Sequence, residues 1–231
     1  MSTLHHLSEH NDHFPDPHQA LEEPNGLLAI GGDLRPTRLL SAYQHGIFPW
    51  FSDDSPILWW SPNPRCVFFP DTVHITRSLF KSLRHRGYRV TFDQAFADVV
   101  LACAAPRSTQ PETWITDEMM AAYTTLHEQK LAHSVEVWSS TGELIGGLYG
   151  VSVGQIFCGE SMFFRARDAS KVALVHLCRY LHQWGYQLLD CQLPNPHLLS
   201  LGATLLSRDA YLDKVTELRD KSVHIDAWNM G

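Results

Sequence analysis

A carboxyl and an amide lie two positions apart in an apolar segment near the C-terminal end of the chain. The segment reads Leu188-Leu189-Asp190-Cys191-Gln192, and residues two apart in an extended strand face the same side of a sheet. Carboxylates are seldom buried without a partner or a function. The pair could therefore orient an amine and take its proton. Alternatively, Asp190 ends the strand and caps a turn, and the sequence favours neither interpretation.

A second carboxyl, that of Glu160, interrupts the apolar segment Phe157–Phe163. The same argument about buried carboxylates makes Glu160 a candidate site residue. Ser161 follows it but lacks the G-x-S-x-G setting of a serine-hydrolase nucleophile. Chemistry here would use a carboxyl, not a serine nucleophile.

A basic helix is predicted over residues 74–86, which contain no acidic residue. Arg77, Lys81 and Arg84 fall at i, i+4 and i+7, on one helical face. Such a face could contact the phosphates of a nucleic acid, or it could simply be solvated. Five of the 18 Lys and Arg residues lie within positions 77–89 of a chain with net charge −7. This concentration makes the two interpretations about equally strong.

Two tryptophans stand in settings that suit base stacking. Trp50 lies in a Pro-Trp-Phe sequence within a proline-rich region, and Trp114 lies in Thr113-Trp114-Ile115-Thr116. Most tryptophans of this kind are core residues, but an aromatic ring in a loop can also hold a nucleobase. Metal binding is not expected, because the histidines at 5, 6, 10, 13 and 18 have no fixed ligand spacing.

Composition limits the class of protein. The 231 residues are 44% hydrophobic and 19% charged, which excludes a largely disordered chain. The five cysteines form no C-x-x-C pair, and the N-terminal residues do not resemble a signal peptide, so a reduced, cytoplasmic protein is expected. No stretch approaches the ~20 apolar residues of a membrane helix. The sequence leaves the oligomeric state open, with a monomer as the default.

The pattern of elements predicts a mixed α/β (α+β) fold with two domains. Prolines and a change of pattern place the boundary near residue 63, giving a small N-terminal domain (1–63) and a larger mixed-sheet domain (64–231). Thr37 is expected to cap a short helix that ends near Gly46. Strands are predicted at 27–30, 67–69, 88–91, 134–138, 144–149, 155–158 and 186–190, and further helices at 96–104, 117–129, 170–184 and 207–219.

Several distinctive segments follow one another along the chain: 23–34 (EPNGLLAIGGDL), 46–52 (GIFPWFS), 57–62 (ILWWSP), 113–116 (TWIT), 132–138 (AHSVEVW), 146–150 (GGLYG), 158–163 (CGESMF), 169–171 (ASK) and 189–192 (LDCQ). Together they resemble one known family, the leucyl/phenylalanyl-tRNA–protein transferases, and the likeness extends from about Phe14 to Leu212. So many ordered matches are far more specific than any single motif.

The resemblance implies a small N-terminal domain followed by a domain of N-acetyltransferase-like fold. It implies transfer of Leu or Phe, and less well Met, from aminoacyl-tRNA to proteins that begin with Arg or Lys. This transfer marks them for degradation through the bacterial N-degron pathway. No cofactor is implied, because the aminoacyl ester is already activated.

The resemblance also implies residue roles. Asp190 and Gln192 would act on the acceptor amine, with Asp190 polarising Gln192, and Glu160 would bind the basic acceptor side chain. Trp50 and Trp114 would hold the terminal adenosine, and Arg77, Lys81 and Arg84 the acceptor-stem phosphates. The pocket for the aminoacyl side chain would be formed by Leu148, Phe157, Met162, Leu174, Leu177, Leu181 and Leu189.

Two alternatives remain open. An acyl-CoA-dependent N-acyltransferase usually carries a glycine-containing loop at a helix start for the pyrophosphate, whereas residues 165–170 (RARDAS) contain no glycine. A non-catalytic RNA-binding module would need only the basic helix and the tryptophans. It would leave Glu160, Asp190 and Gln192 without a role.

Overall fold

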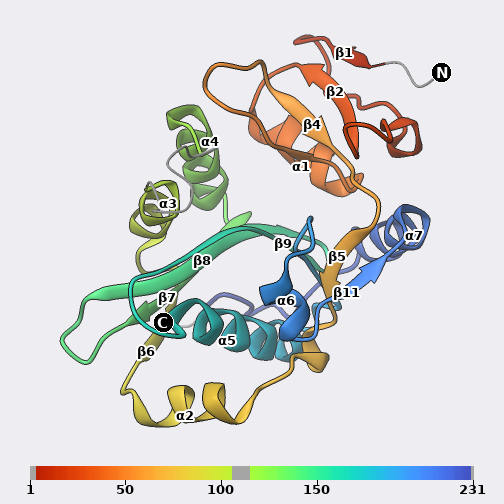
Figure 1. Cartoon of the computed structure of the whole chain (residues 1–231). Coiled ribbons are helices and arrows are strands. Elements are labelled where there is room, and N and C mark those ends of the chain that lie inside the picture. The colour runs from red at the N-terminus through yellow and green to blue at the C-terminus, as the bar shows by residue number, and fades with distance from the viewer. Residues whose placement is uncertain (1–3, 106–114, 230–231) are drawn as a thin grey trace.

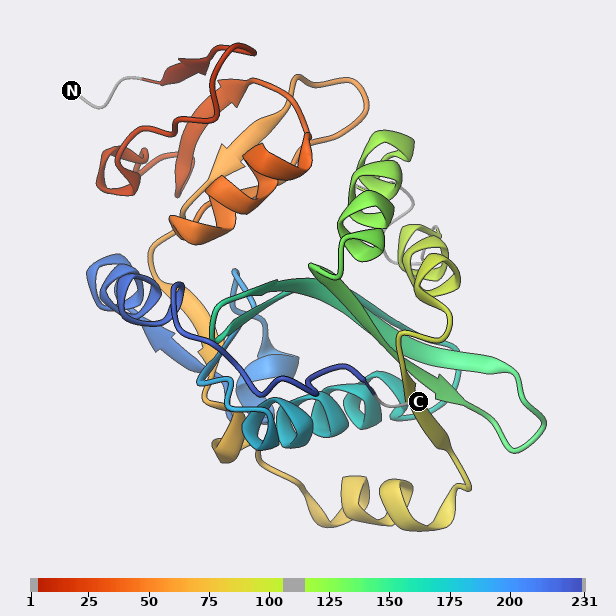
Figure 2. The same cartoon turned by 180° about the vertical axis from the view of Figure 1, so that it is seen from behind.

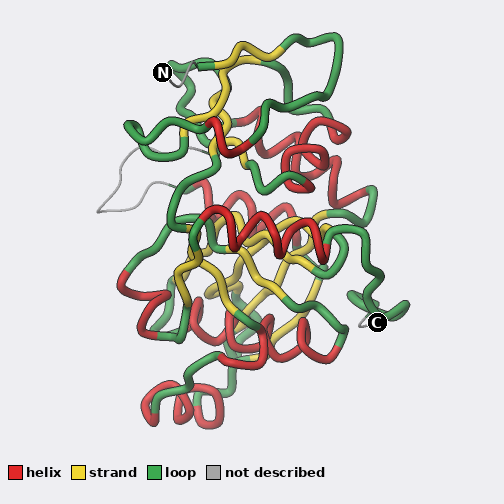
Figure 3. Tube along the Cα trace, turned by 90° about the vertical axis from the view of Figure 1, so that its right-hand side faces the viewer, coloured by secondary structure: helices red, strands yellow, loops and turns green. Residues whose placement is uncertain are grey.

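The chain folds around two β-sheets of different size. The computed structural model describes residues 4–105 and 115–229. Within these residues the strands form a four-stranded and a seven-stranded sheet. Figure 1 shows the smaller sheet, formed by N-terminal residues, above the larger one, and Figure 3 shows helices packed on both sides of the larger sheet's strands.

The strands of the described residues are β1 (His5–Leu7), β2 (Leu27–Gly31), β3 (Phe48–Pro49), β4 (Leu58–Trp60), β5 (Arg65–Phe68), β6 (Arg89–Phe92), β7 (Ala132–Trp138), β8 (Leu144–Val153), β9 (Ile156–Phe164), β10 (Leu188–Asp190) and β11 (Thr204–Leu206). The helices are α1 (Pro36–Gln44), α2 (Arg77–His85), α3 (Phe96–Ala104), α4 (Asp117–Glu128), α5 (Ala169–Gln183), α6 (Pro196–Ser200) and α7 (Arg208–Leu218), with 3-10 turns at Pro17–Gln19 and Pro70–Thr72.

The smaller sheet has the strand order β1-β2-β4-β3 and packs against α1. Its core includes Leu39, Tyr43 and Trp59, all of which are buried. The helix begins at Pro36 without a side-chain cap, so the predicted Thr37 cap is wrong. Proline suits the first helical position because its φ is already helical and the N–H it lacks would have no helical partner there.

The larger sheet has the order β11-β5-β10-β9-β8-β7-β6. Strand β10 runs parallel to β9, and the other neighbouring strands are antiparallel. The chain enters this sheet at β5, shortly after β4 completes the smaller sheet. The proposed boundary at residue 63 falls between these two strands, and the division into domains stays a prediction.

Two apolar clusters separate the faces of the larger sheet. Helices α3 and α4 share one cluster with α1 and the smaller sheet, whereas α5 and α2 share the other. Figure 2 shows the two helical layers on opposite sides of the sheet. None of the helices in the described parts of the chain is long and apolar enough to cross a membrane.

The mixed α/β class predicted from the sequence is confirmed, and α3, α4, α5 and α7 lie within a residue or two of their predicted positions. The basic helix is shorter than predicted, because the Thr76 side chain caps it by accepting from the Leu79 N–H. Strand β10 is also shorter than the predicted 186–190. Strands β1, β3, β4 and β11 and the short helix α6 were not predicted.

Strand β8 is longer than the predicted 144–149, because most of the predicted connection 150–154 belongs to the strand, and β9 continues beyond the predicted 155–158 to Phe164. Gly146 and Gly150 lie inside β8, where neighbouring atoms leave no room for a side chain. A Cβ at Gly146 would lie 2.6 Å from the Cβ of Ala169, and one at Gly150 would clash with the carbonyl of Cys158. Glycine in a strand often marks such a close approach.

Candidate active site

The central feature of the larger sheet is a gap between two parallel strands. Pairing of β9 with β10 stops at the Cys158–Asp190 pair, yet β9 continues to Phe164. Strand β10 ends because the Asp190 carboxylate accepts a hydrogen bond from the Gln192 N–H at 2.9 Å, and Gln192 has a φ of 56°. The strand therefore cannot continue along β9 beyond Asp190.

A pocket of about 200 Å³ fills this gap. For comparison, an apolar cavity of about 150 Å³ holds a benzene ring. Five of the predicted pocket residues line it, namely Leu148 from β8, Met162 from β9, Leu174 and Leu177 from α5, and Leu189 from β10. The other two, Phe157 and Leu181, are fully buried in the same apolar cluster and do not line the pocket.

Glu160 enters the pocket because of a bulge in β9. Tyr149 pairs with Ser161 and Gly150 with Gly159, so Glu160 is an extra residue with no partner on β8. Bulges of this kind redirect a side chain and are common beside active sites. Gln192 also lines the pocket, and its Nε2 donates to Oε1 of Glu160 at 3.2 Å. The structure therefore brings the predicted Glu160 and Gln192 together.

A chain of hydroxyl groups reaches Glu160 from the smaller sheet's helix. Tyr123 of α4 donates to Oε2 of Glu160 at 2.7 Å, and the hydroxyl of Tyr43 in α1 lies 2.6 Å from that of Tyr123. Since Tyr123 directs its hydrogen to Glu160, Tyr43 is the donor of the second bond. Burial raises the pKa of both tyrosines, so both remain neutral donors.

The charge state of Glu160 is set by its surroundings. Burial raises its pKa from 4.5 to about 7, although the hydrogen bond from Tyr123 acts in the opposite direction. A carboxyl that titrates near neutral pH can either bind a cation or exchange a proton at that pH. Such perturbed groups gather at functional sites.

Asp190 lies below the pocket in a buried ion pair. Its two carboxylate oxygens accept from Nε of Arg65 at 2.8 Å and from Nη2 at 2.7 Å, and Tyr211 donates to it at 2.9 Å. The Arg65 guanidinium lies between the rings of Phe48 and Tyr211. Burial disfavours the charged form of Arg65, but the Asp190 carboxylate and Tyr211 together outweigh it and hold the pKa above its ordinary value.

Asp190 therefore contacts Gln192 through the Gln192 backbone N–H, whereas the Gln192 side chain points to Glu160. The alternative in which Asp190 ends the strand and caps a turn is confirmed, and its role toward an amine stays a prediction. The expected side-by-side placement on an extended strand is wrong, because β10 ends at Asp190. Arg65, Tyr123 and Tyr43 were not predicted, since their roles depend on contacts between distant segments.

The remaining predicted residues lie outside this pocket. Arg77, Lys81 and Arg84 are exposed on α2, and the Arg84 guanidinium covers the ring of Phe80 at 5.3 Å. Trp50 is 40% exposed, and its ring packs beside that of Trp60. Trp114 lies outside the described residues.

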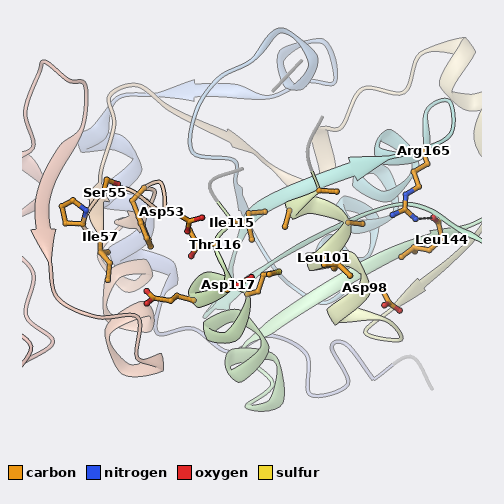
Figure 4. Close-up of a pocket in the computed structure, with 17 residues that line it drawn as sticks. Asp53, Ser55, Ile57, Asp98, Leu101, Ile115, Thr116, Asp117, Leu144 and Arg165 are labelled. Atoms are coloured by element: carbon orange, nitrogen blue, oxygen red, sulfur yellow. Dashed lines mark hydrogen bonds between the residues drawn. The ribbon is translucent and has the colours of Figure 1, made fainter. Parts of the chain in front are cut away.

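A larger cleft of about 1120 Å³ lies between the segment after β3 and helices α3 and α4. Figure 4 shows the carboxylates of Asp53, Asp98 and Asp117 at this cleft, with Arg165 at one end. Phe51 and Ile115 also line it, and each directly follows one of the two predicted stacking tryptophans in the sequence. In the described parts of the chain no group of three or more His, Cys, Asp or Glu side chains could hold a metal ion.

Comparisons with known proteins agree on one family. Its model, described as leucyl/phenylalanyl-tRNA protein transferase, matches residues 67–216, and the model of that family's N-terminal domain matches residues 32–63. The chain belongs to the leucyl/phenylalanyl-tRNA–protein transferase family. The expectations of this family and of an aminoacyltransferase are therefore confirmed.

Curated relatives cover nearly the whole chain. The leucyl/phenylalanyl-tRNA–protein transferase of Shewanella halifaxensis is 53% identical over 99% of this chain and 97% of its own. That of Pseudomonas syringae pv. syringae is 56% identical over 95% and 96%. That of Hahella chejuensis is 54% identical over 94% and 92%.

Solved structures give weaker matches. A GCN5-related N-acetyltransferase from Sphaerobacter thermophilus matches 82% of this chain and 60% of its own, with a TM-score of 0.41 and 13% identity. One from Kribbella flavida matches 73% and 60%, with a TM-score of 0.39 and 10% identity.

The ion pair below the pocket gives a first prediction. We expect Asp190→Asn and Arg65→Met each to lower the free energy of unfolding by about 3–5 kcal/mol, because each leaves a buried partner uncompensated. The double variant should lose clearly less free energy of unfolding than the sum of the two single losses, because it leaves no unpaired charge. Urea titrations of the four proteins measure this coupling, and additive losses would contradict it.

Glu160 gives a second prediction, about pH. Between pH 4.5 and about 7 the folded protein retains a proton on Glu160 that the unfolded chain releases, so this group's contribution to stability falls as pH rises. Glu160→Gln should remove that loss. Its stability relative to wild type should therefore rise by roughly 1–3 kcal/mol across this window.

The measurement is urea unfolding at a series of pH values, with Glu118→Gln on α4 as the matched control, because Glu118 is exposed. A difference between Glu160→Gln and wild type that does not change with pH would show that Glu160 titrates normally.

Proposed function

We propose that the chain transfers Leu or Phe, and less well Met, from aminoacyl-tRNA to the α-amine of proteins that begin with Arg or Lys. In the cell this would create an N-degron in the cytoplasm. The observation that carries the proposal is the apolar pocket of about 200 Å³ with Glu160 and Gln192 on its wall. It combines space for one apolar side chain with polar groups suited to an amine.

The apolar part of the pocket suits the donor side chain. Its walls are Leu and Met side chains that offer no hydrogen bonds, so they favour Leu, Phe and Met over polar amino acids. In an apolar pocket, two side chains that differ by one methylene differ in kcat/KM by only about 10–200-fold. Acceptance of several apolar amino acids follows from this limit.

Glu160 is proposed to bind the basic side chain of the acceptor's first residue. A cation at Glu160 would favour the ionised carboxyl and so lower its raised pKa. The hydrogen bonds from Tyr123 and Gln192 fix the carboxylate before the acceptor arrives. Acidic first residues would be repelled by the same charge.

Gln192 is proposed to contact the acceptor α-amine. Because its NH₂ group donates to Glu160, its carbonyl oxygen is the atom available to accept from an amine N–H. The amine nitrogen attacks the ester carbon, a C–N bond forms, and the C–O bond to the tRNA breaks. The amine proton leaves and the released ribose oxygen takes up a proton, so no metal, nucleophile or ATP is required.

Positioning accounts for most of the rate in this proposal. Holding amine and ester together can supply about 7–11 kcal/mol of the barrier. Asp190 acts as a positioning residue, because its hydrogen bond to the Gln192 N–H holds that residue beyond the end of β10. Arg65 in turn fixes Asp190.

The tRNA is proposed to bind over a wide area. Trp50, exposed beside the larger cleft, and Trp114 would stack on the terminal adenosine, as the resemblance implies. The exposed face of α2 would contact acceptor-stem phosphates through Arg77, Lys81 and Arg84. The absence of a cofactor and the monomeric state stay predictions.

The residues at the start of α5 are unfavourable for the acyl-CoA alternative. The residue before this helix, Asp168, has a φ of 61°, and its carboxylate accepts from Ser82 and pairs with Lys171. A carboxylate at this helix start repels a pyrophosphate, which needs free N–H groups and positive charge there.

A transfer assay tests the proposal directly. Leucyl-tRNA is mixed with peptides that are identical except for an N-terminal Arg, Lys or Asp, and mass spectrometry detects added Leu. We expect one Leu on the Arg and Lys peptides alone. No addition to any peptide, with acetyl-CoA acting as donor instead, would support the acyltransferase alternative.

In the same assay Gln192→Ala should lower kcat by about 10²-fold or more while the affinity for leucyl-tRNA stays unchanged. Gln187→Ala is the matched control, because Gln187 is an exposed glutamine just before β10, at the opposite end of that strand from Gln192. If the protein only binds RNA, the wild type and both variants will show no transfer of Leu.

The basic helix gives a separate prediction. Replacing Arg77, Lys81 or Arg84 by Gln should weaken tRNA binding, and each lost phosphate contact should reduce the slope of log K against log salt by about 1. Filter binding over roughly 50–200 mM salt measures the slope. Lys214→Gln on α7 is the charge-matched control. An equal loss of tRNA binding in this variant would show that the effect comes from the net charge of the protein and not from contacts made by α2.

A further inference from the structure

The C-terminal segment 219–229 packs along the ends of β9 and α5. Figure 2 shows it leaving α7 and passing α5. The Gln155 side chain donates to the carbonyl of Ser222 at 2.9 Å, and the His224 N–H donates to the carbonyl of Trp184 at 2.8 Å. These bonds fix the direction of the segment before it reaches Trp228.

Trp228 is buried at the end of this segment. Its side chain lies in the apolar cluster of α5, and its indole N–H donates to the hydroxyl of Tyr186 at 2.9 Å. The ring stacks on His133 with centroids 4.1 Å apart and on Phe157 at 5.2 Å. Its φ of 66° is unfavourable for a non-glycine residue, so its surroundings determine this placement.

Phe157 links Trp228 to the donor pocket. It is fully buried, lies opposite Leu189 in the pairing of β9 with β10, and shares one apolar cluster with the leucines that line the pocket. Phe157 does not line the pocket itself. It therefore neighbours the lining residue Leu189 and contacts the Trp228 ring.

We propose that Trp228 is a positioning residue that limits the depth of the donor pocket by holding Phe157 in place, and so sets the preference between Leu and Phe. The proposal rests on the proposed function, because it assumes that this pocket takes the donor side chain. Trp228 lies beyond residues 67–216, which the family model matches.

Removal of the Trp228 indole leaves a cavity, because the surrounding residues relax only partly into the space. Phe157 can move into this cavity and so away from the pocket, and the pocket can then accommodate a larger donor side chain. A phenyl group gains contacts in a deeper pocket, whereas the shorter isobutyl group of Leu loses them. In an apolar pocket, a difference of one methylene changes kcat/KM by about 10–200-fold.

The experiment compares Trp228→Ala with wild type, using leucyl-tRNA and phenylalanyl-tRNA with one Arg peptide and measuring kcat and KM separately for each donor. We expect the ratio of kcat/KM for Phe over Leu to rise about tenfold in Trp228→Ala. Trp228→Phe, which keeps an aromatic ring against Phe157, should restore a ratio close to wild type.

Leu218→Ala is the matched control. Leu218 is buried at the end of α7 but in the other apolar cluster, so its loss should lower stability and leave the donor ratio unchanged. Thermal unfolding of every variant is recorded alongside the kinetics. If Trp228→Ala does not fold, Trp228→Leu takes its place, with a smaller rise expected in the same direction.

An unchanged ratio in the folded variant, with both donors slowed equally, would overturn the proposal and leave Trp228 a purely structural residue. A ratio that moves equally in Leu218→Ala would also overturn it. Wild-type protein that uses neither donor would mark a failure of the proposed function instead, so the two failures are distinguishable.

Discussion

The site depends on the buried ion pair between Arg65 and Asp190. Two strands that run parallel normally pair along their whole common length, and β10 stops while β9 continues. Asp190 causes this stop, since its carboxylate binds the N–H of Gln192 and leaves the next residues free to turn away. Arg65 from β5 holds that carboxylate in place. Without the pair, an uncompensated charge would remain in the sheet, and the gap that contains the pocket would lose its edge.

A second constraint joins the two sheets through the same site. Glu160 is directed inward by the bulge in β9, and Tyr123 and then Tyr43 extend its hydrogen bonds to α1. The smaller sheet is thereby coupled to the charge state of the site. A carboxyl held at a pKa of about 7 has a cost in stability, and proteins accept such costs at functional sites.

Prediction from sequence succeeded where local pattern decides structure. The apolar periodicity of α5 and the alternation of β7 gave elements close to the observed ones. Five of the seven residues that the resemblance assigns to a side-chain pocket line the pocket beside β9, and their role stays a prediction. Prediction failed where packing overrides local preference. The segment 150–154 is predicted as a connection between strands, yet β8 continues to Val153, and a Cβ at Gly150 would clash with the carbonyl of Cys158.

The sequence by itself determined the family, the mixed α/β class and most of the side chains that meet at the pocket, because ordered motifs and periodicity are local properties of a chain. Only the tertiary structure decided how those side chains are arranged. It showed that Asp190 pairs with Arg65, 125 positions away in the chain, and that Gln192 turns to Glu160. It also showed that the Trp228 ring stacks on Phe157. Each of these contacts joins segments far apart in the chain, and no spacing within one segment encodes it.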